Sequence, residues 1–212
     1  MNRLLITICG RAGSKGFKNK NLKTFCGHPL VYYSLSAAEL FIKKHPELHI
    51  DIALNTDSPE LAELVAAKYP EVIFLPRGEE LGGDRVPKMA VYQDSLHRME
   101  ERTGQPYDWY MDLDITSPLR TEQDIENAFA KAQEREDLQI ISASARPAAI
   151  RGSICSRSWA TTPRWSSRAS SRAVSRHPRY TTSMRRFTSS AARSLWTTPT
   201  RFCGTPSSAS AL

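Results

Sequence analysis

The sequence predicts an α/β protein in which helices cover both faces of a mainly parallel β-sheet. Three observations predict this fold class: short apolar runs rich in β-branched residues, segments with helical periodicity, and the alternation of the two over residues 1–145. Strands that alternate with helices join through crossover connections, which build parallel sheets. The alternation stops near residue 145, and we expect the chain after it to be irregular.

Each predicted strand is a short apolar run. The first, RLLITIC, ends at Gly10, and the others share its content of β-branched, leucine and aromatic residues. The predicted strands are 3–9, 49–56, 71–75, 108–116 and 138–144.

Each predicted helix begins with a capping residue or a proline. Ser58 is placed to cap a helix that has Pro59 at its first position, and Thr121 precedes a helix with Asp124 in its first turn. The predicted helices are 29–44, 58–69, 87–102 and 121–135.

The charge of the chain is divided unevenly along its 212 residues. Residues 1–145 hold 17 Lys and Arg and all 22 Asp and Glu, a net charge of −5, whereas residues 146–212 hold 12 Arg and no acid. The overall charge of +7 therefore belongs to the second segment. That segment, rich in Ser and Arg, reads either as a disordered tail or as a nucleic-acid-binding tail held by phosphate contacts.

Composition also excludes some classes of protein. No apolar run reaches the length of about 20 residues that a membrane span needs, and the N-terminus lacks the pattern of a signal peptide. The four cysteines, Cys9, Cys26, Cys155 and Cys203, show no CxxC spacing and so indicate neither a zinc site nor a disulfide framework. We expect a cytoplasmic protein without a membrane partner.

The loop RAGSKGFKNKN follows the first predicted strand and combines glycines with cationic side chains. Ligands of α/β sheets bind beyond the carboxyl ends of the strands, where this loop lies. Gly10, Gly13 and Gly16 allow close approach of the backbone to a ligand. Arg11 and Lys15, with Lys20, can pair with phosphate oxygens. The loop reads either as a phosphate cradle or as a solvated basic loop, and its spacing is not that of a Walker A motif.

Four motifs in order resemble those of the acylneuraminate cytidylyltransferases, the CMP-nonulosonic acid synthetases. They are ITICGRAGSKGFKNKN, LNTDS, FLPRGEELGGD and DLDITSPLR, spread over about 145 residues. The chain has Ala12 where the family usually has glycine. It also has Asp114 where many sialic-acid members have glutamine, which resembles the legionaminic-type branch.

The resemblance implies a Rossmann-like nucleotidyltransferase fold of the GT-A type, a three-layer sandwich. It also implies transfer of CMP from CTP to a nine-carbon α-keto acid sugar, with release of pyrophosphate and with Mg²⁺ as cofactor. By resemblance, Lys20 and Arg11 are the catalytic cations, with Lys20 nearest the reacting phosphate. The residues implied in binding CTP are Arg11, Ala12, Gly13, Ser14, Lys15, Asn21, Arg77, Asp114, Thr116 and Ser117.

The sequence does not decide which residues are the metal ligands. Asp112 and Asp114 lie on one face of a strand and either help to hold Mg²⁺ or form a polar strand end. Asp57 is either functional or the cap of the following helix. The resemblance implies a homodimer that binds no nucleic acid, and it places the main metal ligands in a C-terminal region that this chain does not match.

The resemblance stops near Ala145, and we interpret this as a shift in reading frame. If the third base of each codon is joined to the first two bases of the next, RPAAIRGSI permits ARRNPGFN and RYTTSMRRFT permits VYDINASIY, both typical of the family. We interpret residues 1–145 as an incomplete CTP-binding domain and 146–212 as an out-of-frame tail without a stable fold. The alternatives are a nucleic-acid-binding protein with a basic tail and a remnant that binds CTP without turnover.

The shifted-frame interpretation predicts the outcome of sequencing the source DNA across codons 140–155. We expect one base missing from or added to the recorded sequence, in which case the full-length protein is an intact enzyme. An unchanged sequence would contradict a recording error and would indicate a broken copy of the gene.

Overall fold

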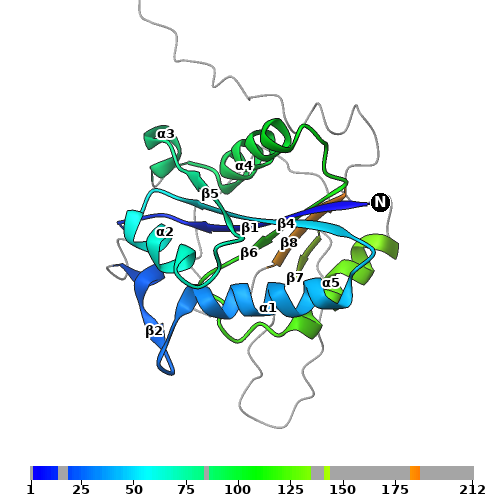
Figure 1. The fold of residues 1–212 in the computed structure, drawn as a ribbon, viewed down its shortest axis with the longest axis horizontal. Helices are drawn as coiled ribbons and strands as arrows, with labels where there is room; N and C mark the ends of the chain where they lie inside the picture. The colour runs from blue at the N-terminus through cyan, green and yellow to red at the C-terminus, as the bar shows by residue number, and fades with distance from the viewer. Residues whose placement is uncertain (1, 14–18, 84–85, 135–140, 144–181, 187–212) are drawn as a thin grey trace, which may run out of the picture.

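The computed structural model describes residues 2–13, 19–83, 86–134, 141–143 and 182–186, the last two ranges as backbone. Within them the main sheet has six strands in the order β5-β4-β1-β6-β8-β7 (Figure 1). The strands are β1 (Arg3–Gly10), β4 (His49–Thr56), β5 (Ile73–Pro76), β6 (Trp109–Leu113), β7 (Ile141–Ala143) and β8 (Thr182–Arg186).

The first four strands of this order are parallel, and their register aligns their carboxyl ends. Gly10 pairs with Thr56, Thr56 pairs with Pro76, and Asp112 of β6 pairs with Thr7 of β1. The chain builds outward from β1 in one direction through β4 and β5, and in the other through β6. Strand order therefore reverses between β1 and β6, and open α/β sheets bind ligands beyond the carboxyl ends at such a point.

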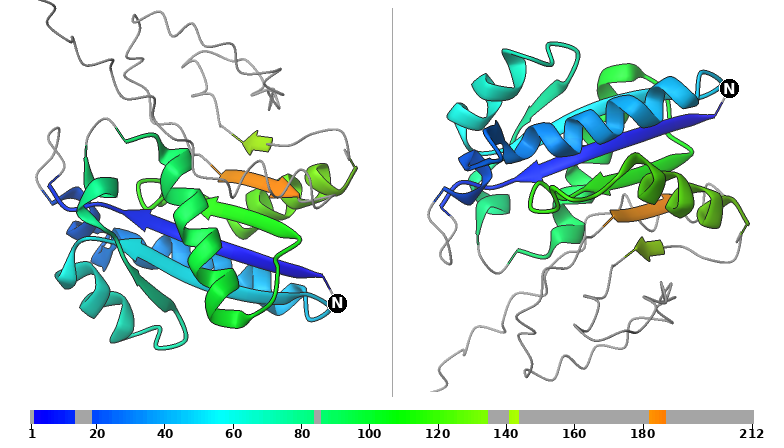
Figure 2. Two further views of the ribbon diagram at one scale, coloured as in Figure 1. Left: turned by 90° about the horizontal axis from the view of Figure 1, so that it is seen from above. Right: turned by 90° about the horizontal axis from the view of Figure 1, so that it is seen from below.

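Helices cover both faces of the sheet, as predicted, because each has one apolar side (Figure 2). On one face, the ring of Phe129 packs edge to face with the rings of both Phe41 and Trp109. On the other face, Leu96 packs with Tyr107 and Tyr110. The first face carries α1 (Leu30–Lys44), α2 (Pro59–Ala66) and α5 (Glu122–Glu134), and the second carries α4 (Lys88–Thr103). No helix among the described residues is both long and apolar enough to cross a bilayer.

The helix ends are set by the capping residues that the sequence indicates. Ser58 Oγ accepts the Leu61 N–H at 3.2 Å, with Pro59 at the first helical position. Thr121 and Asp124 exchange side-chain and backbone hydrogen bonds at the start of α5. These caps satisfy backbone groups that a helix leaves without intrahelical partners.

The predicted elements are present with shifted ends, and short elements join them. Those not predicted are η1 (Lys20–Leu22), the hairpin of β2 (Thr24–Phe25) and β3 (His28–Pro29), and α3 (Glu79–Gly82). The segment after residue 145, expected to be irregular, contributes β8, which is antiparallel to both β6 and β7. A strand can join a ladder through its backbone alone, so the side-chain pattern of this segment did not indicate it. The remainder of residues 146–212 lies outside the described residues.

His45 connects the end of α1 to α5. Its Nδ1 lies 2.7 Å from Glu47 Oε1, its Nε2 lies 3.0 Å from Glu126 Oε1, and its ring packs on Phe41 and Phe129. Desolvation of the ring disfavours the imidazolium, but the hydrogen bonds to Glu47 and Glu126 outweigh it and raise the pKa of His45.

This raised pKa predicts a pH-dependent stability. The contribution of protonated His45 is fully present below the ordinary imidazole pKa of about 6.5 and is lost as the pH rises through the higher pKa of the folded state. Glu126→Gln should remove about 0.5–1 kcal/mol of unfolding free energy near pH 5.5 and much less near pH 8.5, measured by urea denaturation. Glu101→Gln, which removes the partner of the exposed His97, is the matched control and should have little effect at either pH. An equal loss at both pH values for Glu126→Gln would contradict the prediction.

Candidate functional site

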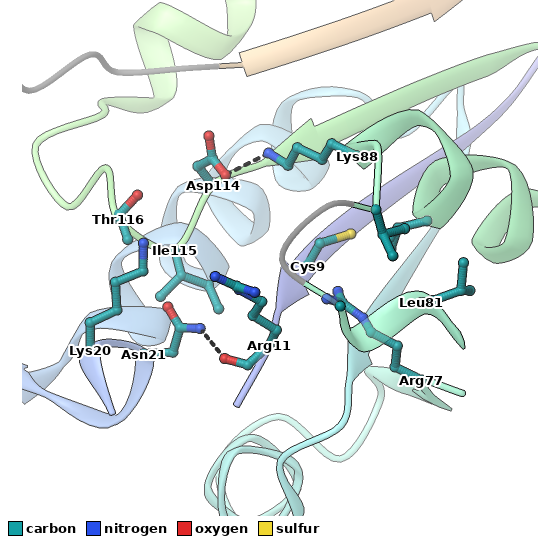
Figure 3. A pocket seen from close by; sticks show the side chains of 13 residues that line it. Cys9, Arg11, Lys20, Asn21, Arg77, Leu81, Lys88, Asp114, Ile115 and Thr116 are labelled. Atoms are coloured by element: carbon teal, nitrogen blue, oxygen red, sulfur yellow. Dashed lines mark hydrogen bonds and ion pairs between the residues drawn. The ribbon is translucent and has the colours of Figure 1, made fainter. Parts of the chain in front are cut away.

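A pocket of about 300 Å³ lies at the carboxyl edge of the parallel strands (Figure 3). The chain after β1, after β5 and after β6, together with the start of α4, forms its walls. One part of the lining is apolar, with Leu81, Val86 and Val91. The pocket therefore occupies the position at the switch point where the fold predicts a ligand.

Cations dominate the charged lining of this pocket. Arg11, Lys20, Arg77 and Lys88 contribute to it, and Asp114 is the one carboxylate among the described lining residues. The basic loop after β1 supplies two of these cations, and the fold adds Arg77 and Lys88 from two other segments of the chain. Such a site favours a ligand that carries several negative charges.

The loop after β1 is held from both sides. Asn21, itself buried, donates from Nδ2 to the Arg11 carbonyl oxygen at 3.0 Å. Asp57 Oδ1 accepts the Ala12 N–H at 2.6 Å, so Asp57 fixes the loop while Ser58 caps α2. A Cβ on Gly10 would lie 2.7 Å from Ile115 Cδ1, so any larger residue there would force this side chain to shift.

Arg77 is oriented by a buried asparagine at the end of β4. Its Nε donates to Asn55 Oδ1 at 2.7 Å and its Nη2 donates to the Asn55 carbonyl oxygen at 3.0 Å. Asn55 in turn donates from Nδ2 to Ser95 Oγ on α4 at 2.9 Å. A buried side chain whose donors and acceptor are occupied holds one orientation, so the guanidinium is fixed before any ligand arrives.

Lys88, the first residue of α4, bridges two carboxylates at the pocket wall. Its Nζ donates to Asp112 Oδ2 at 2.8 Å and to Asp114 Oδ1 at 2.6 Å (Figure 3 shows the contact with Asp114). Desolvation disfavours the ammonium, but the charges of Asp112 and Asp114 outweigh this and raise the pKa of Lys88. Lys88 is therefore cationic throughout the ordinary pH range.

Asp112 lies beneath the pocket with 1% of its surface exposed. Besides Lys88, the Tyr92 hydroxyl donates to Asp112 Oδ2 at 2.7 Å, and Thr7 Oγ1 lies 3.4 Å from Asp112 Oδ1. Burial, followed by the charge of Asp112, raises the pKa of Tyr92, so the hydroxyl keeps the proton that it donates. Asp112 is thus engaged by the protein itself.

Asp114 sits in the turn after β6, and its backbone is fixed by two side chains. Its carbonyl oxygen accepts from Ser34 Oγ at 2.9 Å and from Arg120 Nη2 at 3.2 Å. Its carboxylate lines the pocket with Thr116 alongside, whereas Ser117 is buried at 1% exposure. The side chains of this turn therefore divide between the pocket and the interior.

Few side chains of this pocket could coordinate a metal ion. Within the ranges that carry side chains, no group of three His, Cys, Asp or Glu is placed to hold one. Mg²⁺ commonly binds proteins through one or two carboxylates together with substrate phosphates, so a single carboxylate in a pocket for a polyanion fits it. Of the two carboxylates proposed from the sequence, Asp114 faces the pocket and Asp112 does not.

The structure brings together many of the residues that the sequence indicates. Those that line the pocket are Arg11, Lys20, Asn21, Arg77, Asp114 and Thr116. Ala12 and Gly13 belong to the exposed loop, with Gly13 at φ +67°, while Ser14 and Lys15 lie outside the described residues. Ser117, implied by the resemblance in binding CTP, is not among the lining residues and is buried at 1% exposure.

Three residues of the site were missed in the sequence: Asn55, Lys88 and Tyr92. Asn55 lies within the LNTDS motif, and a polar residue at the end of an otherwise apolar strand is the signal that could have indicated it. Lys88 and Tyr92 lie four residues apart and so share one face of a helix, but that spacing does not reveal which buried group they contact.

A family profile described as cytidylyltransferase matches residues 5–175, which is most of the chain. The chain belongs to the cytidylyltransferase family. Post-translational flagellin modification protein B of Campylobacter coli is 36% identical over 143 residues, which are 68% of this chain and 58% of that protein. The CMP-N,N'-diacetyllegionaminic acid synthase of Campylobacter jejuni is 37% identical over 118 residues, 56% of this chain and 48% of that protein.

The chain therefore spans about half the length of the curated relatives that it matches. Among solved structures, the CMP:2-keto-3-deoxy-manno-octonic acid synthetase complexed with CTP superimposes with a TM-score of 0.54 at 16% identity. The match covers 87% of this chain and 74% of that one. At this identity the likeness concerns the fold, and it agrees with the nucleotidyltransferase architecture predicted from the sequence.

The hydrogen bond from Tyr92 to Asp112 predicts a loss of stability in Tyr92→Phe. Removal of a donor to a buried carboxylate should lower the unfolding free energy by about 2 kcal/mol, measured by chemical denaturation. Tyr33→Phe is the matched control, because the Tyr33 hydroxyl donates to the Phe25 carbonyl oxygen at an exposed site. Equal losses in the two variants would show that the buried carboxylate does not depend on Tyr92.

Proposed function

We propose that this chain is the nucleotide-binding part of an enzyme that transfers CMP from CTP to a nine-carbon α-keto acid sugar. The observation that carries the proposal is the convergence of Arg11, Lys20 and Arg77 on one pocket at the switch point of the sheet, in a chain of the cytidylyltransferase family. A nucleoside triphosphate supplies the negative charge that such a pocket favours.

The lining of the pocket supports one orientation of CTP. Arg11 and Lys20 belong to the glycine-containing loop and line the pocket. They would hold the phosphates through charge-assisted hydrogen bonds to the phosphate oxygens. The apolar side chains of Leu81 and Val86 would contact the flat base, and Arg77, fixed by Asn55, would lie at its polar edge.

The chemistry proposed is an in-line displacement at the α-phosphorus. The anomeric hydroxyl oxygen of the sugar forms a bond to phosphorus, the bond to the bridging oxygen breaks, and its electron pair leaves with pyrophosphate. The hydroxyl proton passes to water. Negative charge grows on the oxygens around phosphorus, and the cations Lys20 and Arg11 stabilise it.

Mg²⁺ is proposed as the cofactor. When bound, it would neutralise phosphate charge and polarise the reacting phosphoryl group. Asp114 is the residue of this chain that would hold it, because its carboxylate lines the pocket. The remaining ligands would be phosphate oxygens and water, as is usual for this ion.

The acceptor is proposed to be an N-acylneuraminate or legionaminate. The named relatives include a CMP-N,N'-diacetyllegionaminic acid synthase, pseudaminic acid cytidylyltransferases and N-acylneuraminate cytidylyltransferases. We further propose a cytoplasmic location. The homodimer implied by the family resemblance would need residues beyond 1–145. Since residues 146–212 do not carry the motifs that the family resemblance implies, we expect impaired turnover in this chain.

Isothermal titration with CTP tests the nucleotide site directly. Lys20→Ala and Arg11→Ala should each weaken CTP binding at least about tenfold, since each removes a charge-assisted contact to phosphate. Lys43→Ala is the matched control, because Lys43 pairs with Glu39 on the exposed side of α1, away from the pocket, and should leave the affinity unchanged.

A pyrophosphate-release assay with CTP and a panel of nonulosonic acids separates binding from catalysis. CTP binding without release of pyrophosphate is the expected result for this chain, and turnover at ordinary rates would contradict the impairment. The proposed function would be overturned if the chain bound RNA in a salt-dependent manner but did not bind CTP. In that case RNA binding should be lost when residues 146–212 are removed.

A further inference from the structure

We propose that Lys88 is a positioning residue that acts as a built-in cation. Its ammonium occupies the space between Asp112 and Asp114, so of this pair of carboxylates only Asp114, on its pocket side, is left for a divalent ion. The inference deepens the proposed function, since it concerns the residue proposed to hold the metal. It rests on the contacts of Lys88 and not on the identity of the nucleotide.

The geometry places one cation between two carboxylates. Lys88 Nζ lies 2.8 Å from Asp112 Oδ2 and 2.6 Å from Asp114 Oδ1, so an ion at this position would lie between the two oxygens. An ammonium has three N–H donors, and these contacts use two of them. The stem of Lys88 passes the Tyr92 ring, with Nζ 5.4 Å from its centroid, which favours a cation at this point.

Burial explains why the site needs a cation of its own. Asp112 has 1% of its side chain exposed, and an ionised carboxylate removed from water is costly unless it is paired. Asp114 has 25% of its side chain exposed and lines the pocket. Without Lys88, two negative charges would stand close together at the wall of a pocket that is otherwise lined with cations.

The arrangement also controls how Asp114 meets a metal. Lys88 engages Oδ1, which leaves Oδ2 as the oxygen that a metal in the pocket can take. A metal held by one carboxylate oxygen keeps most of its coordination sites for phosphate oxygens and water. A metal held between Asp112 and Asp114 would sit deeper in the wall, farther from a ligand in the pocket.

The test is a titration of the full-length chain with Mn²⁺ in the absence of nucleotide. Electron paramagnetic resonance measures the concentration of Mn²⁺ that remains unbound. Lys88→Gln releases both carboxylates and should bind Mn²⁺ at least about tenfold more tightly than the wild type, because a second carboxylate joins the ligand set. The gain should disappear in Lys88→Gln/Asp112→Asn. Lys88→Arg keeps the cation and should bind as weakly as the wild type, and Lys68→Gln controls for loss of a remote lysine.

Thermal unfolding gives a second readout. Lys88→Gln should unfold at a lower temperature than the wild type in EDTA, and Mn²⁺ should restore much of the loss, because an ion that binds only the folded state stabilises it. Unchanged Mn²⁺ affinity in Lys88→Gln, a gain that survives Asp112→Asn, or a variant that stays unfolded with Mn²⁺ would each overturn the proposal. Failure of the wild type to bind CTP would contradict the proposed function and leave these results standing.

Discussion

The buried carboxylate of Asp112 is the constraint on which the site depends. It ends a central strand inside the protein, where a charge without partners would be strongly destabilising. Lys88 and Tyr92 satisfy it from one helix, and Thr7 approaches it from the neighbouring strand. The start of α4 is thereby tied to the carboxyl edge of the sheet, and this places one wall of the pocket.

The same edge is organised by side-chain hydrogen bonds that hold the elements around the pocket. Asn55 fixes Arg77, Asp57 and Asn21 hold the loop after β1, and Arg120 holds the turn at Asp114. Functional groups supported in this way lose little conformational freedom when a ligand binds. The pocket therefore combines a preformed wall at Arg77 and Lys88 with a loop that is held by hydrogen bonds at Arg11 and Ala12.

The sequence predicted the α/β class and the position of the site, because both depend on local patterns. Apolar runs, caps such as Ser58 and the basic loop are visible in short stretches of residues. The contact between Lys88 and Asp112 was not predictable, since Asp112 lies on a strand that only the topology brings close to Lys88. The burial of Ser117 could not be predicted for a related reason: its motif is recognisable, but whether each side chain of the turn faces the pocket or the core depends on packing.

The position of β8 bears on the solubility of the chain. All five residues of β6 are buried, and β8 pairs along its full length, from Trp109 opposite Arg186 to Leu113 opposite Thr182. An apolar strand left at the edge of a sheet is a template for pairing with other molecules and for aggregation. Because ladder pairing uses the backbone, a segment without the side-chain pattern of a strand can still shield that edge. Residues 182–186 can thus contribute to the solubility of the chain by covering this strand.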